Sequence, residues 1–256
     1  MELLHLHNVS LWRNSVTILK NINLTIKYGE QWAVLGPNGS GKSFLMNIIA
    51  TLVFPSSGEV VIAGKKLGEV NVWDVRKHIG IVSDYLQYSY PAMTKTVEVV
   101  ASGFYSSLGL YQELSPTILQ KAESILQTLG LEHYAQTPFG KLSYGEQKRV
   151  LIGRAIVYDP NILILDEPCN GLDIRAREEF LHKLTDLVAI KKHIIYVTHH
   201  VDEIMPWINR VMLLADGQCM YAGDRSVLED EALLSRVMGY PLGIFHHNSR
   251  TYWYIK

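Results

Sequence analysis

The sequence is poor in cysteine and lacks both a long apolar run and an excess of charge of one sign. Cys169 and Cys219 are its only cysteines, and no CxxC pair occurs. This usage argues against a disulfide framework or a cysteine-based zinc site and indicates a reducing compartment. No apolar stretch reaches the roughly 20 residues that a membrane-spanning helix needs.

The N-terminus and the charge exclude further classes. The opening residues, Met-Glu-Leu-Leu-His-Leu-His, lack the basic lead and apolar core of a signal peptide. The net charge is −1, from 24 basic and 25 acidic residues that are interspersed, so there is no strong nucleic-acid signal. We therefore expect a cytoplasmic chain without a membrane span. Any peripheral role on the cytoplasmic face of a membrane would need a separate partner.

A glycine-rich loop stands out, between the apolar run Trp32–Leu35 and a helical pattern that begins at Phe44. Glycines let successive backbone N–H groups point at an anion, and the following helix adds its positive end. Lys42 can reach the β- and γ-phosphates, and the Ser43 hydroxyl can ligand Mg²⁺. An ordinary turn is the alternative, but a strand before and a helix after favour a nucleoside triphosphate site. The loop reads Gly36, Pro37, Asn38, Gly39, Ser40, Gly41, Lys42 and Ser43.

Strand and helix patterns alternate along the rest of the chain. Residues 85–140 lose the strand signals, and helical spacing after Ser115-Pro116 predicts an inserted helical lobe. Arg177–Val188 has helical spacing between two buried strands, which predicts an α/β sheet with ligands beyond its carboxyl ends. Ser226–Glu229 is interpreted as the capping box of a last helix, and Ile244–Ile255 as a small hairpin. The predicted strands cover residues 3–11, 19–26, 59–63, 79–83, 161–167 and 193–199.

Two further groups of polar residues can carry chemistry. Asp166 and Glu167 end an apolar strand, where Asp166 can contact Mg²⁺ and Glu167 can activate the attacking water. The alternative is a pair of solvated carboxylates at a strand end, and the phosphate loop upstream argues against it. Upstream, Ser143 and Gly145 stand at a helix start, a second anion-receptive surface. An ordinary helix cap is the competing interpretation there.

In order and spacing these motifs resemble those of the ATP-binding cassette (ABC) ATPases, over residues 3–225. The resemblance implies a P-loop NTPase core of mostly parallel sheet with flanking helices, plus an antiparallel β subdomain and an inserted α-helical lobe. It divides the chain into an ATPase domain at 1–225, with the lobe and signature at 84–155, and a C-terminal helix and hairpin extension at 226–256. The matching motifs are Gly36–Ser43 (Walker A), Leu142–Glu146 (signature), Ile162–Glu167 (Walker B), Asn170–Asp173 (D-loop) and Thr198-His199 (switch histidine).

The resemblance also implies an Mg²⁺-dependent ATPase in which each ATP lies between one Walker A motif and the signature of a second cassette, either in a homodimer or as one half of a heterodimer. Trp12 would stack on adenine, although a strand aromatic packed in the core is the alternative. His199 is preferred over His200 because it directly follows the threonine of its strand. The implied catalytic residues are Lys42, Glu167 and His199, the metal ligands are Ser43, Asp166 and Asp84, and further nucleotide contacts are Phe44, Ser143, Gly145, Glu146 and Asp173.

The chain departs from the family pattern at two places. Asp84 stands where the Q-loop glutamine should end its strand, and Gln87 follows three residues later. Asp84 can keep the metal contact, but coupling to a membrane domain is put in doubt. Tyr144 and Glu146 replace glycine and glutamine in the signature, a variation that we expect to be tolerated. Two stretches, 102–111 and 167–169, resemble stand-alone bacterial cassettes related to molybdate-type and photorepair-type proteins.

Two functions follow from the resemblance. The first is the ATP-binding and hydrolysing subunit of an ABC transporter, which couples dimer closure to a separately encoded membrane permease. The second is a soluble cassette that acts on a protein or nucleic-acid assembly, and Asp84 favours it. The commonness of transporter cassettes favours the first function.

Overall fold

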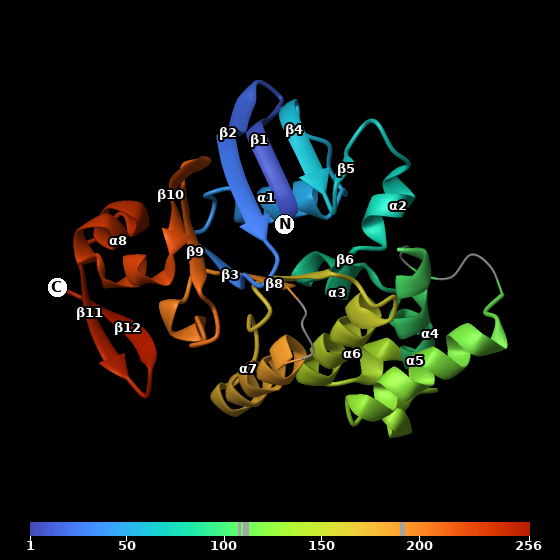
Figure 1. Cartoon of the computed structure of the whole chain (residues 1–256). Helices are drawn as coiled ribbons and strands as arrows, with labels where there is room; N and C mark the ends of the chain where they lie inside the picture. The colour runs from blue at the N-terminus through green and yellow to red at the C-terminus, as the bar shows by residue number, and fades with distance from the viewer. Residues whose placement is uncertain (107–108, 110–112, 190–192) are drawn as a thin grey trace. The chain divides into compact units, whose positions relative to one another are not determined.

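The structure is a computed structural model that describes residues 1–106, 109, 113–189 and 193–256. The chain separates into two compact units, of which the first comprises Met1–Val75 with Leu184–Lys256 and the second Arg76–Lys183. The predicted α/β class is confirmed, because parallel strands, antiparallel strands and helices all occur (Figure 1). Among the described residues, no helix is long and apolar enough to cross a bilayer.

One sheet of the first unit is antiparallel, with the strand order β2-β1-β4-β5 (Figure 1). Asn14 and Ser15 form the turn between β1 and β2, and their φ angles of 49° and 64° suit the twist of a two-residue hairpin. This sheet is the antiparallel β subdomain that the family resemblance implied. Its strands are β1 (Glu2–Arg13), β2 (Val16–Lys27), β4 (Ser57–Ile62) and β5 (Lys65–Lys66).

The other strands that position functional residues in the first unit run in the order β10-β9-β3-β8. Every residue of β3 is buried, and β3 pairs in parallel with β8 on one side and β9 on the other. Leu35 is paired with Thr198, so the glycine-rich loop and His199 leave the sheet at the same edge. The elements are β3 (Trp32–Leu35), α1 (Lys42–Ile49), α2 (Val72–Arg76), β8 (His193–Thr198), η4 (Val201–Glu203), β9 (Arg210–Ala215) and β10 (Gln218–Asp224).

The C-terminal part of the first unit is a helix followed by a hairpin, as predicted. The predicted start of the helix is wrong, since Asp230 and not Ser226 is the cap: its carboxylate accepts the Leu233 N–H at 2.9 Å. Ser226 lies in a preceding 3₁₀ turn, where the Asp224 carboxylate accepts its N–H. A second aspartate thus competes for the cap and moves the helix start. The elements are η5 (Arg225–Glu229), α8 (Glu231–Met238), β11 (Leu242–His247) and β12 (Arg250–Ile255).

The second unit combines a parallel strand pair, β6 and β7, with helices. Ser83 is paired with Asp166, so Asp84 and Glu167 follow neighbouring strand ends at one edge. Gly80 lets β6 and α6 approach closely, because an added Cβ would lie 2.3 Å from the Ala155 carbonyl oxygen. The elements are β6 (Ile79–Ser83), α3 (Asp84–Ser89), α4 (Thr96–Ala101), η1 (Ser102–Tyr105), α5 (Pro116–Thr128), η2 (Glu132–Tyr134), η3 (Phe139–Lys141), α6 (Tyr144–Ile156), β7 (Ile162–Asp166) and the part of α7 (Ile174–Ala189) up to Lys183.

Helix positions in the second unit follow the sequence patterns closely. Ser115 caps α5 as predicted. Helix α7 begins before the predicted Arg177, because the Asp173 carboxylate accepts the Ala176 N–H at 2.8 Å and starts the helix earlier. The helical lobe expected at 84–155 falls inside this unit, and its exact boundaries stay a prediction. Within the stretch 102–111, residues 107–108 and 110–111 lie outside the described part.

Candidate functional site

The glycine-rich loop curls tightly at the carboxyl end of β3. Gly39 and Gly41 have φ angles of 79° and 101°, a left-handed conformation that other residues rarely adopt. Gly36 is required by packing instead, because an added Cβ would lie 2.0 Å from the Leu214 carbonyl oxygen of β9. The loop therefore depends on glycine for two separate reasons, and its backbone has the concave form that binds anions.

Lys42 and Ser40 supply polar groups on the inside of this loop. Lys42 Nζ donates to the carbonyl oxygens of Gly36 at 2.9 Å and of Pro37 at 3.0 Å, and the residue is only 4% exposed. Ser40 Oγ is buried and has no hydrogen-bond partner among the described residues. A phosphate oxygen placed in the loop would satisfy this hydroxyl and replace the carbonyls as the partner of the ammonium. Ser43, at the start of α1, is exposed.

His199 stands on a turn that a buried carboxylate organises. Glu203, which is 4% exposed, accepts hydrogen bonds from the hydroxyls of Thr198 at 2.7 Å and Tyr196 at 3.0 Å. The Thr198 hydroxyl in turn accepts the backbone N–H of His200 at 3.0 Å. Glu203 thereby shapes the turn that carries both histidines, a role that no sequence motif indicated. His200 is exposed, whereas His199 is partly buried.

Asp166 and Glu167 stand at the end of β7 in the second unit. The Asp166 side chain is largely buried, which suits a carboxylate held for a cation. Glu167 has a φ of 47°, a left-handed conformation that is uncommon for a residue with a Cβ and is concentrated at functional sites. Its Oε2 accepts a hydrogen bond from Asn170 Nδ2 at 2.8 Å. The backbone and this amide together set the direction of the Glu167 carboxylate.

The signature serine is tied to Glu146 by a capping box at the start of α6. The Ser143 N–H and hydroxyl donate to Glu146 Oε2 at 2.8 Å and 2.7 Å, and the Glu146 N–H donates to Ser143 Oγ at 3.4 Å. Burial raises the pKa of Glu146, but hydrogen bonds from Ser143 and from the Tyr134 hydroxyl outweigh it and hold that pKa below its ordinary value. The carboxylate is therefore ionised beside Ser143 at neutral pH.

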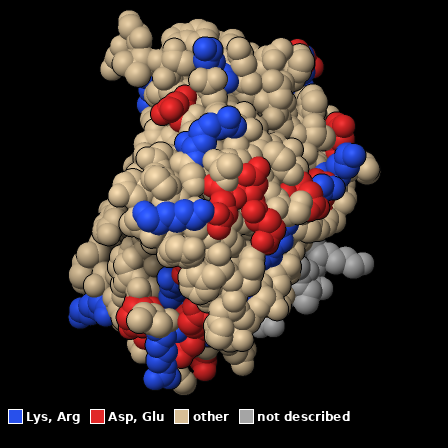
Figure 2. All heavy atoms as spheres, turned by 90° about the vertical axis from the view of Figure 1, so that its left-hand side faces the viewer, with Lys and Arg blue, Asp and Glu red and all other residues tan. Residues whose placement is uncertain are grey.

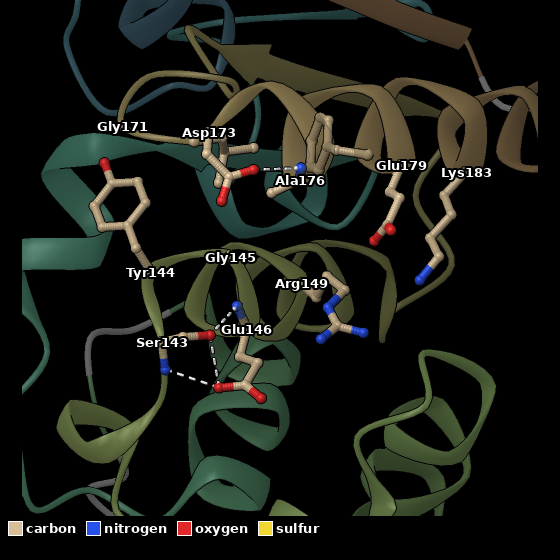
Figure 3. Close-up of a pocket in the computed structure, with 12 residues that line it drawn as sticks. Ser143, Tyr144, Gly145, Glu146, Arg149, Gly171, Asp173, Ala176, Glu179 and Lys183 are labelled. Carbon is tan, nitrogen blue, oxygen red and sulfur yellow. Dashed lines mark hydrogen bonds between the residues drawn. The ribbon is translucent and has the colours of Figure 1, made fainter.

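A pocket of about 310 Å³ in the second unit brings the signature and the D-loop together (Figure 3). Arg149 of α6 and Lys183 of α7 also line it, and their side chains extend toward the same space (Figure 3). The predicted nucleotide contacts on this surface therefore share one cavity, whose lining includes two basic side chains as well as acidic ones. The sequence-predicted residues that line it are Ser143, Gly145, Glu146 and Asp173.

Trp12 and Phe44 belong to the first unit. Trp12 is 50% exposed on β1, which argues against the alternative of a packed core aromatic. Its stacking on adenine stays a prediction. The Arg13 guanidinium lies over the Phe44 ring, 5.5 Å from the ring centroid.

Comparison with known proteins decides the family. Residues 19–170 match the family model described as ABC transporter. The chain belongs to the ABC transporter family. The ABC transporter ATP-binding protein YlmA of Bacillus subtilis is 38% identical over 255 residues, which cover 98% of this chain and 96% of that protein.

Solved ABC cassettes share the fold. The dimeric structure of a bacterial ABC transporter cassette is 29% identical with a TM-score of 0.75, covering 87% of this chain and 98% of that one. CbiO1 from Clostridium perfringens, part of the ABC transporter complex CbiONQ, is 28% identical with a TM-score of 0.74, covering 92% and 93%. This ABC protein is thus an ATP-binding and hydrolysing cassette that uses ATP and Mg²⁺.

The side chains in these motifs fit both ATP and Mg²⁺. The buried Ser40 hydroxyl and the ammonium of Lys42 suit a triphosphate in the loop. Ser43 in the first unit and Asp166 in the second each carry an oxygen of the kind that Mg²⁺ prefers as a ligand.

Asp84, the departure from the Q-loop pattern, lies among partners that no sequence motif indicated. It forms an ion pair with Lys148 and accepts hydrogen bonds from the Tyr144 hydroxyl at 3.3 Å and Asn170 Nδ2 at 3.4 Å. Gln87, the other candidate for the glutamine, is buried and donates to Gln147 at 2.8 Å. A sequence signal for Lys148 did exist, since it stands on the apolar stripe of α6.

Proposed function

We propose that this cassette binds Mg²⁺-ATP in the Gly36–Ser43 loop and closes over it against the Ser143–Glu146 surface of a second cassette. The observation that carries this proposal is the pocket of Figure 3, where signature and D-loop residues face one space together with the basic side chains of Arg149 and Lys183. A γ-phosphate docked there would meet the Ser143 hydroxyl, the Gly145 backbone and the start of α6. The dimeric relative supports a paired arrangement, and a homodimer needs no other chain.

The roles of individual residues follow from their chemistry. Lys42 would neutralise charge on the β- and γ-phosphates, and Ser43 and Asp166 would hold Mg²⁺, which when bound neutralises phosphate oxygens. Glu167 would orient a water and take its proton while the water oxygen bonds to the γ-phosphorus. The bond from that phosphorus to the bridging oxygen then breaks, leaving ADP and inorganic phosphate. His199 would donate a hydrogen bond to the γ-phosphate, and Asp173 would connect the paired sites.

The energy of closure would be transmitted to a separately encoded membrane permease. CbiO1, a relative, is part of an ABC transporter complex, and the family as a whole supports a transport role over action on a soluble assembly. The face shown in Figure 2 has acidic and basic side chains next to one another, with no continuous basic stripe among its described residues. Because the substrate is ATP, we place the protein on the cytoplasmic face of the membrane, peripheral to its permease.

The boundaries given above for the cassette, lobe and extension, and the relationship to molybdate-type and photorepair-type cassettes, belong to this proposal.

Replacing Glu167 tests the mechanism. Glu167→Gln removes the proton acceptor but keeps the phosphate loop, so the variant should bind ATP, stop hydrolysing it and elute as a dimer from gel filtration in Mg²⁺-ATP. Glu167→Gln combined with Lys42→Ala is the matched control, and it should stay monomeric. A Glu167→Gln protein that binds ATP yet never dimerises would contradict the closure model. Recovery of a polytopic membrane protein with the wild type from solubilised membranes tests the permease.

A further inference from the structure

The two departures from the family pattern are in contact with each other in the second unit. The Tyr144 hydroxyl donates to Asp84 Oδ1 at 3.3 Å, and the Lys148 ammonium pairs with the same oxygen. Asp84 and Tyr144 are therefore two parts of one arrangement and not independent variations.

The Lys148 side chain is fully buried, whereas 34% of the Asp84 side chain is exposed. A buried ammonium needs a carboxylate partner. This requirement anchors Asp84 Oδ1 on the Lys148 side. The second carboxylate oxygen, Oδ2, then faces Asn170, whose Nδ2 lies 3.4 Å away.

Asn170 connects this arrangement to the proposed base. A side-chain NH₂ group carries two hydrogens, and that of Asn170 donates to Asp84 Oδ2 and to Glu167 Oε2, the latter at 2.8 Å. If alanine replaced Asn170, neither hydrogen bond could form. Serine or threonine could form only one of them, because a hydroxyl has a single hydrogen to donate. The Asn170 amide thus fixes the position of the Glu167 carboxylate relative to that of Asp84.

The Tyr144 ring also contacts the D-loop. Gly171 has a φ of 75°, and a Cβ there would lie 2.8 Å from the Tyr144 ring, so the ring packs directly on the backbone next to Asn170 (Figure 3). The Q-loop position, the signature helix and the D-loop therefore meet around the Asp84–Lys148 ion pair, in which only the lysine is fully buried.

We propose that Asp84 and Asn170 are positioning residues for hydrolysis: Asp84, anchored by Lys148, holds the Asn170 amide, which aims the Glu167 carboxylate at the attacking water. This inference rests on the proposed role of Glu167. It gives Asp84 a function that needs no contact with the metal. It also predicts that Asp84→Gln does not improve hydrolysis, because a neutral side chain leaves Lys148 without its counter-charge.

Asn170→Ala is the decisive variant, because it removes the amide but leaves the Asp84–Lys148 pair intact. Misplacing a catalytic group by about 1 Å costs on the order of 100-fold in rate, so we expect kcat for ATP hydrolysis to fall by roughly 10- to 100-fold. The KM for ATP and the affinity for a fluorescent ATP analogue should stay at wild-type values. Asn161→Ala is the matched control, since it removes an asparagine bonded to His78 at the opposite end of β7. It should hydrolyse ATP normally.

Three further measurements separate positioning from metal binding and from loss of structure. In a Glu167→Gln background, Asn170→Ala should cause no further loss of the residual hydrolysis. Asp84→Asn should lower kcat as Asn170→Ala does, and neither should change the Mg²⁺ concentration needed for half-maximal binding of the ATP analogue. Thermal unfolding of each variant identifies any that fails to fold, and Asn170→Ala then carries the test alone.

The outcomes are distinguishable. Wild-type kcat in Asn170→Ala, with hydrolysis abolished in Glu167→Gln, overturns this inference and leaves the proposed function standing. A higher Mg²⁺ requirement in Asp84→Asn but not in Asn170→Ala also overturns it, by assigning Asp84 to the metal. Normal hydrolysis by Glu167→Gln contradicts the proposed function itself.

Discussion

Neutralising the two members of the Asp84–Lys148 ion pair should destabilise the protein by unequal amounts. The partners differ in exposure, since the Lys148 side chain is fully buried and 34% of the Asp84 side chain reaches the surface. Asp84→Ala leaves the buried ammonium without its carboxylate. Lys148→Met removes the charge but keeps an unbranched apolar chain of similar length in the same space.

The magnitudes follow from this asymmetry. Removing one partner of a buried pair and stranding the other charge costs about 3–5 kcal/mol, which is our expectation for Asp84→Ala. In Lys148→Met the remaining carboxylate can be hydrated and keeps its donors Tyr144 and Asn170. We therefore expect a loss of about 1 kcal/mol there, the net value of an ordinary hydrogen bond. For a chain of this size each kcal/mol lowers Tm by about 2–4 °C.

Thermal and urea unfolding of the full chain, followed by circular dichroism without nucleotide, measure both costs, and leaving ATP out prevents ligand binding from masking them. The double variant Asp84→Ala with Lys148→Met should recover most of the stability lost in Asp84→Ala alone, because no charge is then stranded. Equal losses, or a larger loss in Lys148→Met, would refute the reasoning that the buried ammonium dictates the position of Asp84.

Three other predictions concern the first unit. Lys42→Ala should weaken binding of a fluorescent ATP analogue by at least about tenfold, because a charge-assisted contact to phosphate is lost; unchanged affinity would remove Lys42 from the site. Gly36→Ala should lower Tm measurably, since its Cβ would lie 2.0 Å from the Leu214 carbonyl oxygen; an unchanged Tm would contradict that packing. Hydrogen bonds from Lys256 and then from the Ile244 N–H hold the pKa of Glu231 below its ordinary value. A group with a lowered folded-state pKa stabilises above its unfolded pKa and loses this effect as pH falls through the folded value. The Tm difference between wild type and Glu231→Gln should therefore be present at pH 7 and disappear in acid below the ordinary glutamate range, and a difference that persists there would contradict the assignment.

The sequence predicted the parts of the site that depend on neighbours along the chain. Glycines within a few residues of Lys42 specify the curl of the phosphate loop, and the apolar runs before Asp166 and His199 specify buried strands. The capping box of Ser143 with Glu146 is likewise local. Even here, competition between nearby caps misled the sequence analysis, as Asp230 took the helix start assigned to Ser226.

Contacts between residues far apart in sequence required the tertiary structure. Asp84 meets Lys148 across 64 positions and Asn170 across 86. Helical spacing places Lys148 on the apolar stripe of α6, but no periodicity or motif identifies the Asp84 carboxylate as its partner. Glu203 was missed although its partners Tyr196 and Thr198 are close in sequence, because no periodicity or motif shows that the chain turns back after β8 and brings both hydroxyls to one carboxylate.

By itself the sequence determined that this chain binds a nucleoside triphosphate, because backbone conformation and helix dipoles act over a few residues and are written in local residue types. Only the tertiary structure decided which groups surround the Asp84 carboxylate. A buried charge is stabilised by whichever opposite charge the fold brings to it, and that choice belongs to the packing of α6 against β6 and to the turn after β7.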